Sequence, residues 1–294
     1  MVKQRFGLFD AANYAFLLLL TAGFVFPFLY VFNLSISSSF LIANGTFKFL
    51  PVGINLDAYK VILQSRSIWT GYANSVLQSV VGTLLTLILC SLPAYVLTAR
   101  EFRHKKAYTI FFVATMFFNG GIIPTFLVIQ KLGMLDTIWA IVIIPALSAW
   151  NIILFRTNFK EIPDSIIESA KIDGANHFWI YLKLVVALSK PIFAVLAIFS
   201  FVAIWNSYFP ALLYLTSQDK QPLMIVLRKL VVVGNVRGDT EWIITQLGQT
   251  INPLGLQRSM KMATIMVSVL PIVLIYPFMQ KYLSKGILVG SIKG

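Results

Sequence analysis

The composition of this chain points to a membrane. Of its 294 residues, 58% are hydrophobic and 12% are charged, and the mean hydropathy is +0.81. These values exclude an ordinary water-soluble globule. Lys and Arg number 24 against 11 Asp and Glu, a net charge of +13. In so apolar a chain this excess favours a membrane surface or loop topology over nucleic acid. With Cys90 as the only cysteine, an intramolecular disulfide and a cysteine-rich metal site are excluded.

Stretches free of Asp, Glu, Lys and Arg recur along the chain and are long enough to cross a bilayer, whose core of about 30 Å needs roughly 20 apolar helical residues. We therefore predict an all-α, polytopic membrane protein with six transmembrane helices in a single transmembrane domain, residues 1–294. Prolines within the stretches predict bent helices. The expected spans are residues 13–34, 72–98, 107–129, 138–155, 191–214 and 262–279, and the prolines are Pro27, Pro93, Pro124 and Pro145.

The first stretch follows Lys3 and Arg5, as in a secretory signal peptide. Its apolar length exceeds that of a signal peptide and no A-x-A-like cleavage site follows closely, so we expect a retained anchor. With the N-terminus inside, the inner segments hold 14 Lys and Arg and the longer outer loops hold 10, which predicts that both termini are cytoplasmic. The inner segments are residues 1–12, 99–106, 156–190 and 280–294. We interpret the basic loop Arg100–Lys106 as a topology determinant facing lipid head groups rather than a ligand site.

Two outer loops are long, residues 35–71 and 216–261. The second contains an apolar amphipathic stretch, Leu223–Val233, among polar and turn residues. This pattern predicts either a folded external lobe that contacts another protein or a helix lying on the membrane surface.

Catalytic and ion-coupling signatures are missing from the sequence. None of the predicted spans carries the carboxylate that secondary transporters usually need. No phosphate-binding loop, H-E-x-x-H or G-x-S-x-G motif occurs, and His104 and His177 lie in separate loops. We therefore predict no catalytic residue and no metal ligand, and any energy for transport must be converted on another subunit.

The inner loop, residues 156–190, is too long for a simple turn. Its apolar and polar positions predict two short amphipathic helices. Pro163, Asp164 and Ser165 supply helix-start chemistry, and Asp173-Gly174 supplies the break. Ser165-x-x-Glu168 also fits a capping box. An alternative is therefore that Glu168 serves only to cap the first of these helices.

Residues 168–175, Glu-Ser-Ala-Lys-Ile-Asp-Gly-Ala, resemble the EAA loop of ATP-binding-cassette importer permeases, in the version of carbohydrate permeases similar to the maltose type. Residues 119–124, 133–139 and 285–294 are similar to the subgroup for complex oligosaccharides and polysaccharide fragments. Ser169 departs from the EAA pattern but is small. Val186-Ala187 replaces the Leu-Pro that the family often has, which leaves open how the chain bends into the fifth span.

The resemblance implies one half of an importer in the bacterial plasma membrane, paired with a second permease subunit. An ATP-binding-cassette ATPase dimer would bind ATP and Mg, an external solute-binding protein would deliver an oligosaccharide, and this chain would hold no cofactor. The cytoplasmic tail resembles one that enters the ATPase interface. The residues implied at the ATPase interface are Glu168, Ser169, Ala170, Asp173, Gly174, Ala175 and Gly294.

Polar and aromatic residues in or near the spans could line a sugar path, or could serve interhelical hydrogen bonds and interfacial anchoring. They are Asn74, Gln78, Asn119, Trp150, Asn151, Trp205, Asn206 and Tyr208. Acidic substrates such as alginate-type oligouronates agree with the basic outer loop, which holds Arg228, Lys229, Arg237 and Arg258. The competing classes are a secondary transporter or channel for a small polar solute, working without an ATPase, and a membrane-embedded enzyme.

Overall fold

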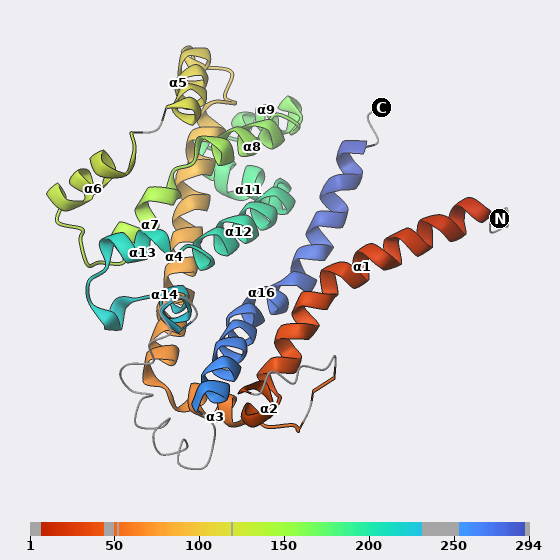
Figure 1. Ribbon diagram of the computed structural model, residues 1–294. Helices are drawn as coiled ribbons and strands as arrows, with labels where there is room; N and C mark the ends of the chain where they lie inside the picture. The colour runs from red at the N-terminus through yellow and green to blue at the C-terminus, as the bar shows by residue number, and fades with distance from the viewer. Residues whose placement is uncertain (1–6, 44–49, 52, 119, 231–252, 292–294) are drawn as a thin grey trace. The chain divides into compact units, whose positions relative to one another are not determined.

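The computed structural model describes residues 7–43, 50, 51, 53–118, 120–230 and 253–291. Within these ranges the regular structure is helical, and the β pairing is limited to an isolated antiparallel bridge between Ser37 and Ile54. The predicted all-α class is confirmed (Figure 1). By contacts the chain forms two compact units, described separately here: residues 1–69 with 227–270, and residues 70–226 with 271–294.

Three helices are each long and apolar enough to cross a membrane: α1 (Leu8–Ser35), α4 (Arg66–Val96) and the Gly255–Pro277 part of α16 (Pro253–Ser291). Three pairs of shorter helices reach the same threshold together. If each bent pair is one span, the described residues hold up to six. The pairs are α5 (Lys105–Phe117) with α6 (Ile122–Lys131), α7 (Trp139–Ala146) with α8 (Ala149–Phe159), and residues 177–188 with α12 (Lys190–Trp205).

The chain bends by 47° between α7 and α8, and side chains provide hydrogen-bond partners for backbone groups at this bend. Pro145 lies inside α7, and Ser148 caps α8 by accepting a hydrogen bond from the Asn151 amide at 3.4 Å. The buried Cys90 thiol of α4 donates to the Ala146 carbonyl at 3.3 Å and accepts from the Ser148 amide at 3.4 Å. Backbone groups freed by the bend therefore have partners inside the protein, as a membrane interior requires.

The prolines predicted to bend the spans differ in where they lie within the helices. Pro27 and Pro93 lie inside α1 and α4 as expected, whereas Pro124 lies in the first turn of α6 and does not interrupt it. Pro271 and Pro277 lie inside α16. This helix begins at Pro253, so its first two turns lie within the predicted outer loop 216–261. The prediction missed them because Arg258 and Lys261 end the charge-free stretch but do not end the helix.

The first unit joins α1, α2 (Ser39–Ala43), α3 (Asp57–Gln64) and the start of α16. The hydroxyls of Ser35 and Tyr59 lie 2.8 Å apart, and Arg258 donates to the Ile42 carbonyl at 3.3 Å. Gly255 passes so close to Ser39 that a Cβ would overlap its backbone. Within the described residues, none of the apolar span window of α1 is buried.

The second unit is built around α4. A buried cluster unites its second half with α8, α9 (Asp164–Ile172), the π-helix η1 (Ile180–Val185) and α12; Phe155, Ile180 and Leu196 are almost fully buried in it. Near the middle of α4, Gly82 has no side chain, so Ile204 and Val142 can approach the helix backbone closely. Small residues at such crossings are how apolar helices pack tightly in a membrane.

A second buried cluster joins α6, α7, α13 (Phe209–Tyr214) and α14 (Leu223–Arg228). Leu223 and Ile225 of α14 are 0% and 1% exposed. Part of the stretch 223–233 is therefore packed against the protein, and the choice between an external lobe and a membrane-surface helix stays a prediction. Residues 231–233 lie outside the described ranges.

Candidate coupling surface and transport path

The inner loop folds as two helical segments on either side of Gly174, as predicted. The first is α9, and Gly174 then adopts φ +82°, a left-handed conformation that glycine allows without strain. The Gly174 amide donates to Lys171 at 3.0 Å, and Asn176 caps the next segment by accepting from the Trp179 amide at 2.8 Å. That segment runs through α10 (His177–Trp179), η1 and α11 (Val186–Leu188).

The bend into α12 lies at Ser189, directly before Lys190-Pro191, and measures 82°. Val186-Ala187, where the resemblance led us to expect Leu-Pro, lies in α11, shortly before this bend. The π-helical turn before it was not predicted, because apolar periodicity does not distinguish π from α geometry over six residues.

The capping box considered as the alternative role of Glu168 does not form. Helix α9 starts at Asp164 with Pro163 as its N-cap, so Ser165 lies inside the helix and cannot cap it. The Glu168 carboxylate instead accepts from Arg100 at 2.9 Å. Its contact is therefore with the loop that follows α4.

Five of the predicted interface residues share one surface. Ser169, Ala170, Asp173, Gly174 and Ala175 line a groove of about 650 Å³ beside the turn. Glu168 lies apart from them and lines a separate cavity of about 300 Å³. Gly294 lies outside the described residues.

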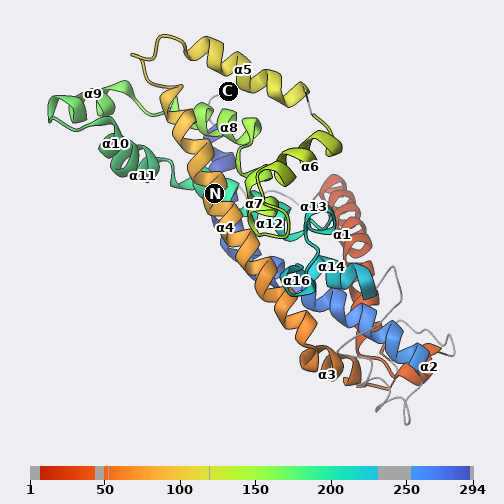
Figure 2. The same cartoon turned by 90° about the vertical axis from the view of Figure 1, so that its left-hand side faces the viewer.

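The tip of the loop is apolar and exposed, while its base is buried. Ile172 is 86% exposed and Phe178 66%, whereas Ala170 and Ile180 are buried in the cluster that includes α4 and α8. An exposed apolar patch on a rigid base is typical of a docking surface. We call residues 164–179 the coupling knob. Figures 1 and 2 show α9 at one end of α4, with α14 toward the other.

Ion pairs tie the coupling knob to the loop after α4. Arg100 bridges Asp164 and Glu168, and Lys171 pairs with Glu101; we call these five residues the brace. The hydrogen bond from Lys171 holds the pKa of Glu101 below its ordinary value, so this carboxylate stays charged at neutral pH. Arg100 has carboxylate partners on α9, and the expectation that the basic loop faces lipid head groups stays a prediction.

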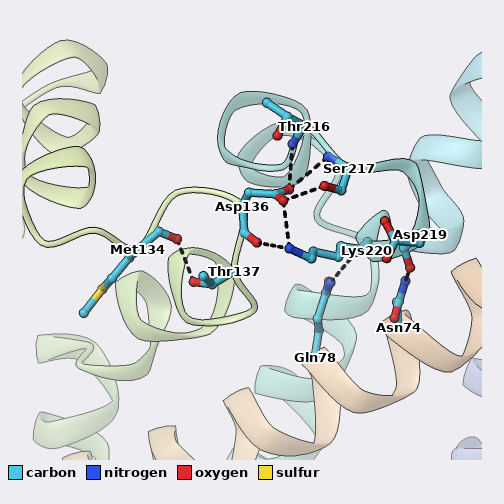
Figure 3. Close-up of polar contacts among 9 residues, drawn as sticks. All are labelled: Asn74, Gln78, Met134, Asp136, Thr137, Thr216, Ser217, Asp219 and Lys220. Carbon is cyan, nitrogen blue, oxygen red and sulfur yellow. Dashed lines mark hydrogen bonds and ion pairs between the residues drawn. The ribbon is translucent and has the colours of Figure 1, made fainter.

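The other end of α4 holds a second polar network (Figure 3). Asp136, at φ +56°, accepts hydrogen bonds from the amides of Thr216 and Ser217 at 3.0 and 2.9 Å. The hydroxyl of Ser217 donates to it at 2.6 Å and Lys220 at 2.8 Å. We call these four residues the latch. Together they hold the loop before α7 against the loop after α13.

Two predicted path residues support the latch from α4. Asn74 donates to the carbonyl of Asp219 at 2.6 Å, and Gln78 donates to that of Lys220 at 3.4 Å (Figure 3). Asn74 also donates to the carbonyl of Gln221 at 3.1 Å. These side chains therefore hold the segment after α13, and their part in a sugar path stays a prediction.

The remaining path residues separate into three groups. Trp150, 60% exposed, and Asn151 line a groove of about 490 Å³ together with Phe199 and Ser200. Trp205 is buried, with Tyr72 edge-on at 5.5 Å. Asn206 and Tyr208 are exposed, and Asn119 lies outside the described residues. Sequence reasoning did not single out Ser200, Asp136 or Lys220 for the path or its support, because their partners are far away along the chain.

The described helices include several that are long and apolar enough to cross a membrane, and the comparisons with known proteins assign the chain to a family of membrane transport proteins. Residues 66–289 match the family described as binding-protein-dependent transport system inner membrane component. The chain belongs to this family, which confirms the resemblance. The relatives below are permease proteins of transport systems.

The chain is 38% identical over 294 residues to the polygalacturonan/rhamnogalacturonan transport system permease protein YtcP of Bacillus subtilis, with all of both chains covered. It is 28% identical to the arabinooligosaccharides transport system permease protein AraQ of Halalkalibacterium halodurans, covering 94% and 96% of the two chains. A chain in the crystal structure of a bacterial transporter involved in import of the acidic polysaccharide alginate is 33% identical, with a TM-score of 0.87 over 96% of this chain and 99% of that one.

The latch should resist acid. Hydrogen bonds from Lys220 and Ser217 hold the pKa of Asp136 well below its ordinary value. A carboxylate with a lowered pKa stabilises the fold above its unfolded pKa and loses that effect only as the pH falls through the lowered value. Hydrogen exchange at Thr216 and Ser217 should therefore show equal protection, after correction for the intrinsic rate, between about pH 5 and about pH 8.

Asp136→Asn should speed this exchange severalfold. Asp219→Asn removes the same charge from the same region and weakens only an electrostatic interaction with Lys220, so it should speed the exchange less. Equal exchange rates in the two variants would show that the latch does not hold the loop.

The brace should matter for coupling more than for stability. Its side chains are about half exposed, so each pair contributes at most about 1 kcal/mol, a factor of about five. Arg100→Glu places a third carboxylate beside Asp164 and Glu168, and should lower substrate-stimulated ATP hydrolysis by the assembled transporter about two- to fivefold.

Adding Asp164→Arg to Arg100→Glu should recover part of the loss. Arg103→Glu is the matched control, because Arg103 is exposed and its substitution makes the same charge change in the same loop. If the Arg103 variant loses as much activity as the Arg100 variant, general charge explains the effect and the brace does not.

Proposed function

We propose that this chain is the permease subunit of a binding-protein-dependent ATP-binding-cassette importer that brings acidic oligosaccharides into the cytoplasm. The observation that carries the proposal is the agreement of two full-length relatives. One is named for polygalacturonan and the other comes from an alginate importer. Both polymers are built of uronic acids, so their fragments share a row of carboxylates on a sugar backbone.

The coupling knob is the part of the chain that would receive the motion of the ATPase. Ile172 and Phe178 offer exposed apolar side chains for a cleft, and Ala170 anchors the knob to the buried cluster. A helix wedged in a cleft transmits closure as rigid-body motion. ATP and Mg would bind to the ATPase subunits, and this chain would have no catalytic role. A second permease subunit and an external binding protein complete the proposed assembly.

The proposed topology puts the coupling knob inside the cell. The knob and the basic loop after α4 are joined by the brace, and basic loops stay preferentially in the cytoplasm. The latch then lies on the external side, where a binding protein would deliver substrate. Both termini remain cytoplasmic in this proposal.

The groove at Trp150 is the best candidate for sugar contact within this chain. An exposed indole offers a face for stacking on a sugar ring, and Asn151 and Ser200 offer polar groups beside it. Asn74 and Gln78 are less suited, since their amides already bind backbone carbonyls.

The substrate is tested by reconstituting the chain with its partner permease, ATPase and binding protein in vesicles. Oligogalacturonates or alginate oligosaccharides should stimulate ATP hydrolysis, and their methyl esters, which keep the backbone but lose the charge, should not. Equal stimulation by the acids and their esters would contradict recognition of the carboxylates.

The docking role of the knob is tested at Gly174. A Cβ meets no atom within 4 Å there, so Gly174→Ala adds only the strain of a left-handed backbone, about 1 kcal/mol. We expect reduced recovery of the ATPase with the purified permease and normal membrane insertion.

Gly133→Ala is the matched control, because Gly133 has φ +67° and equally open surroundings but lies in the loop after α6. Normal ATPase recovery with both variants would remove the knob from the proposed interface.

A further inference from the structure

A second cavity near the brace has a different character. It measures about 260 Å³ and lies where the end of α4, the start of α5 and the end of α8 meet. Four cations and two apolar side chains define it: Lys105, Lys106, Arg156, Lys160, Leu97 and Ile110. We call this cavity the basic pocket.

The charge of the basic pocket is uncompensated among the residues that the structure describes. None of its lining side chains is acidic, and the four cations make no ion pair there, in contrast to Arg100 and Lys171 in the brace. The Nε of Arg156 is buried without a hydrogen-bond partner. A buried donor of a charged group without a partner is costly, so the arrangement calls for an anionic ligand.

The start of α5 adds to the positive potential. This helix has 13 residues, no acidic residue in its first turn, and no side-chain cap from His104. Its first amides and the helix dipole therefore favour an anion at the mouth of the pocket. The hydroxyls of Thr98 and Thr109 donate to carbonyls of their own segments at 2.7 Å, so binding would rest on the cations and the helix start.

The apolar surroundings indicate a ligand with hydrocarbon chains. Ile110 lines the pocket and is 59% exposed, and the next exposed side chain along α5, Phe111, is 62% exposed. A free phosphate would leave this surface uncovered, whereas a lipid would put its phosphate among the cations and its chains along α5. Basic pockets between membrane helices on the cytoplasmic side suit such head groups.

We propose that the basic pocket is a binding site for the phosphate head group of an anionic membrane lipid. Thr98 and Lys160 line both this pocket and the cavity of the brace. A bound lipid would therefore lie directly against the segment that holds the coupling knob. The inference depends on the membrane location of the family and on the proposed cytoplasmic side of this loop, and not on the proposed sugar.

The test uses the whole importer purified in detergent, with bound lipids counted by native mass spectrometry after incubation with phosphatidylglycerol or phosphatidylcholine. Lys106 and Lys160 are exposed, so Lys106→Gln and Lys160→Gln should leave the fold intact. Each removed charge should weaken retention of phosphatidylglycerol about fivefold, and the double variant about 25-fold. Phosphatidylcholine, which has no net charge, should be retained weakly by all forms.

Arg103→Gln removes the same charge from the same loop without lining the pocket, and should retain phosphatidylglycerol as the unaltered protein does. Lys160→Arg should also retain it. Equal retention by the double variant and the Arg103 variant would overturn the site. Displacement of the lipid by millimolar inorganic phosphate alone would overturn the lipid as its ligand and assign the pocket to free phosphate.

Discussion

The contact between the coupling knob and the end of α4 is the constraint on which this account depends. The predicted spans contain no charged residue. In the proposed importer the work enters mechanically from the ATPase, and such coupling needs a structural connection between the knob and the rest of the chain. The structure supplies one in two layers: a buried apolar cluster in which Ala170 packs with residues of α4 and α8, and the ion pairs of the brace above it.

From that end, α4 extends as a helix of 31 residues to the polar network at the latch. Asn74 and Gln78 hold the loop after α13, and the latch ties this loop to the one before α7. Packing and hydrogen bonds therefore connect the knob, through α4, to the latch. The bend at α7 and α8 lies beside this path, with its backbone groups satisfied by Cys90.

Much of this could be predicted from sequence, because the signals are local. Charge-free length predicted long apolar helices, and Asp173-Gly174 predicted the turn of the knob, which needs a left-handed residue. The prediction failed where partners lie far apart along the chain. Nothing near Glu168 in sequence indicates Arg100, so only ATPase docking and a capping box were considered for it. Charge also misled at α16, since Arg258 and Lys261 end an apolar run but are compatible with a helix.

The residues predicted for the sugar path also show that sequence does not reveal distant partners. Residue type alone grouped Asn74 and Trp150 as potential sugar ligands, although one amide is used by backbone carbonyls and the other side chain is exposed in a groove. Only the tertiary structure separates a polar residue that holds the protein together from one that remains available to a ligand.

The central claim is that the coupling knob docks on the ATPase, and photo-crosslinking tests it directly. A benzophenone amino acid at Ile172, the most exposed apolar position of the knob, should form an adduct with the ATPase subunit in the assembled transporter. The same group at Leu132, 60% exposed in the loop after α6, should form none. An ATPase adduct from Leu132 with none from Ile172 would contradict the account.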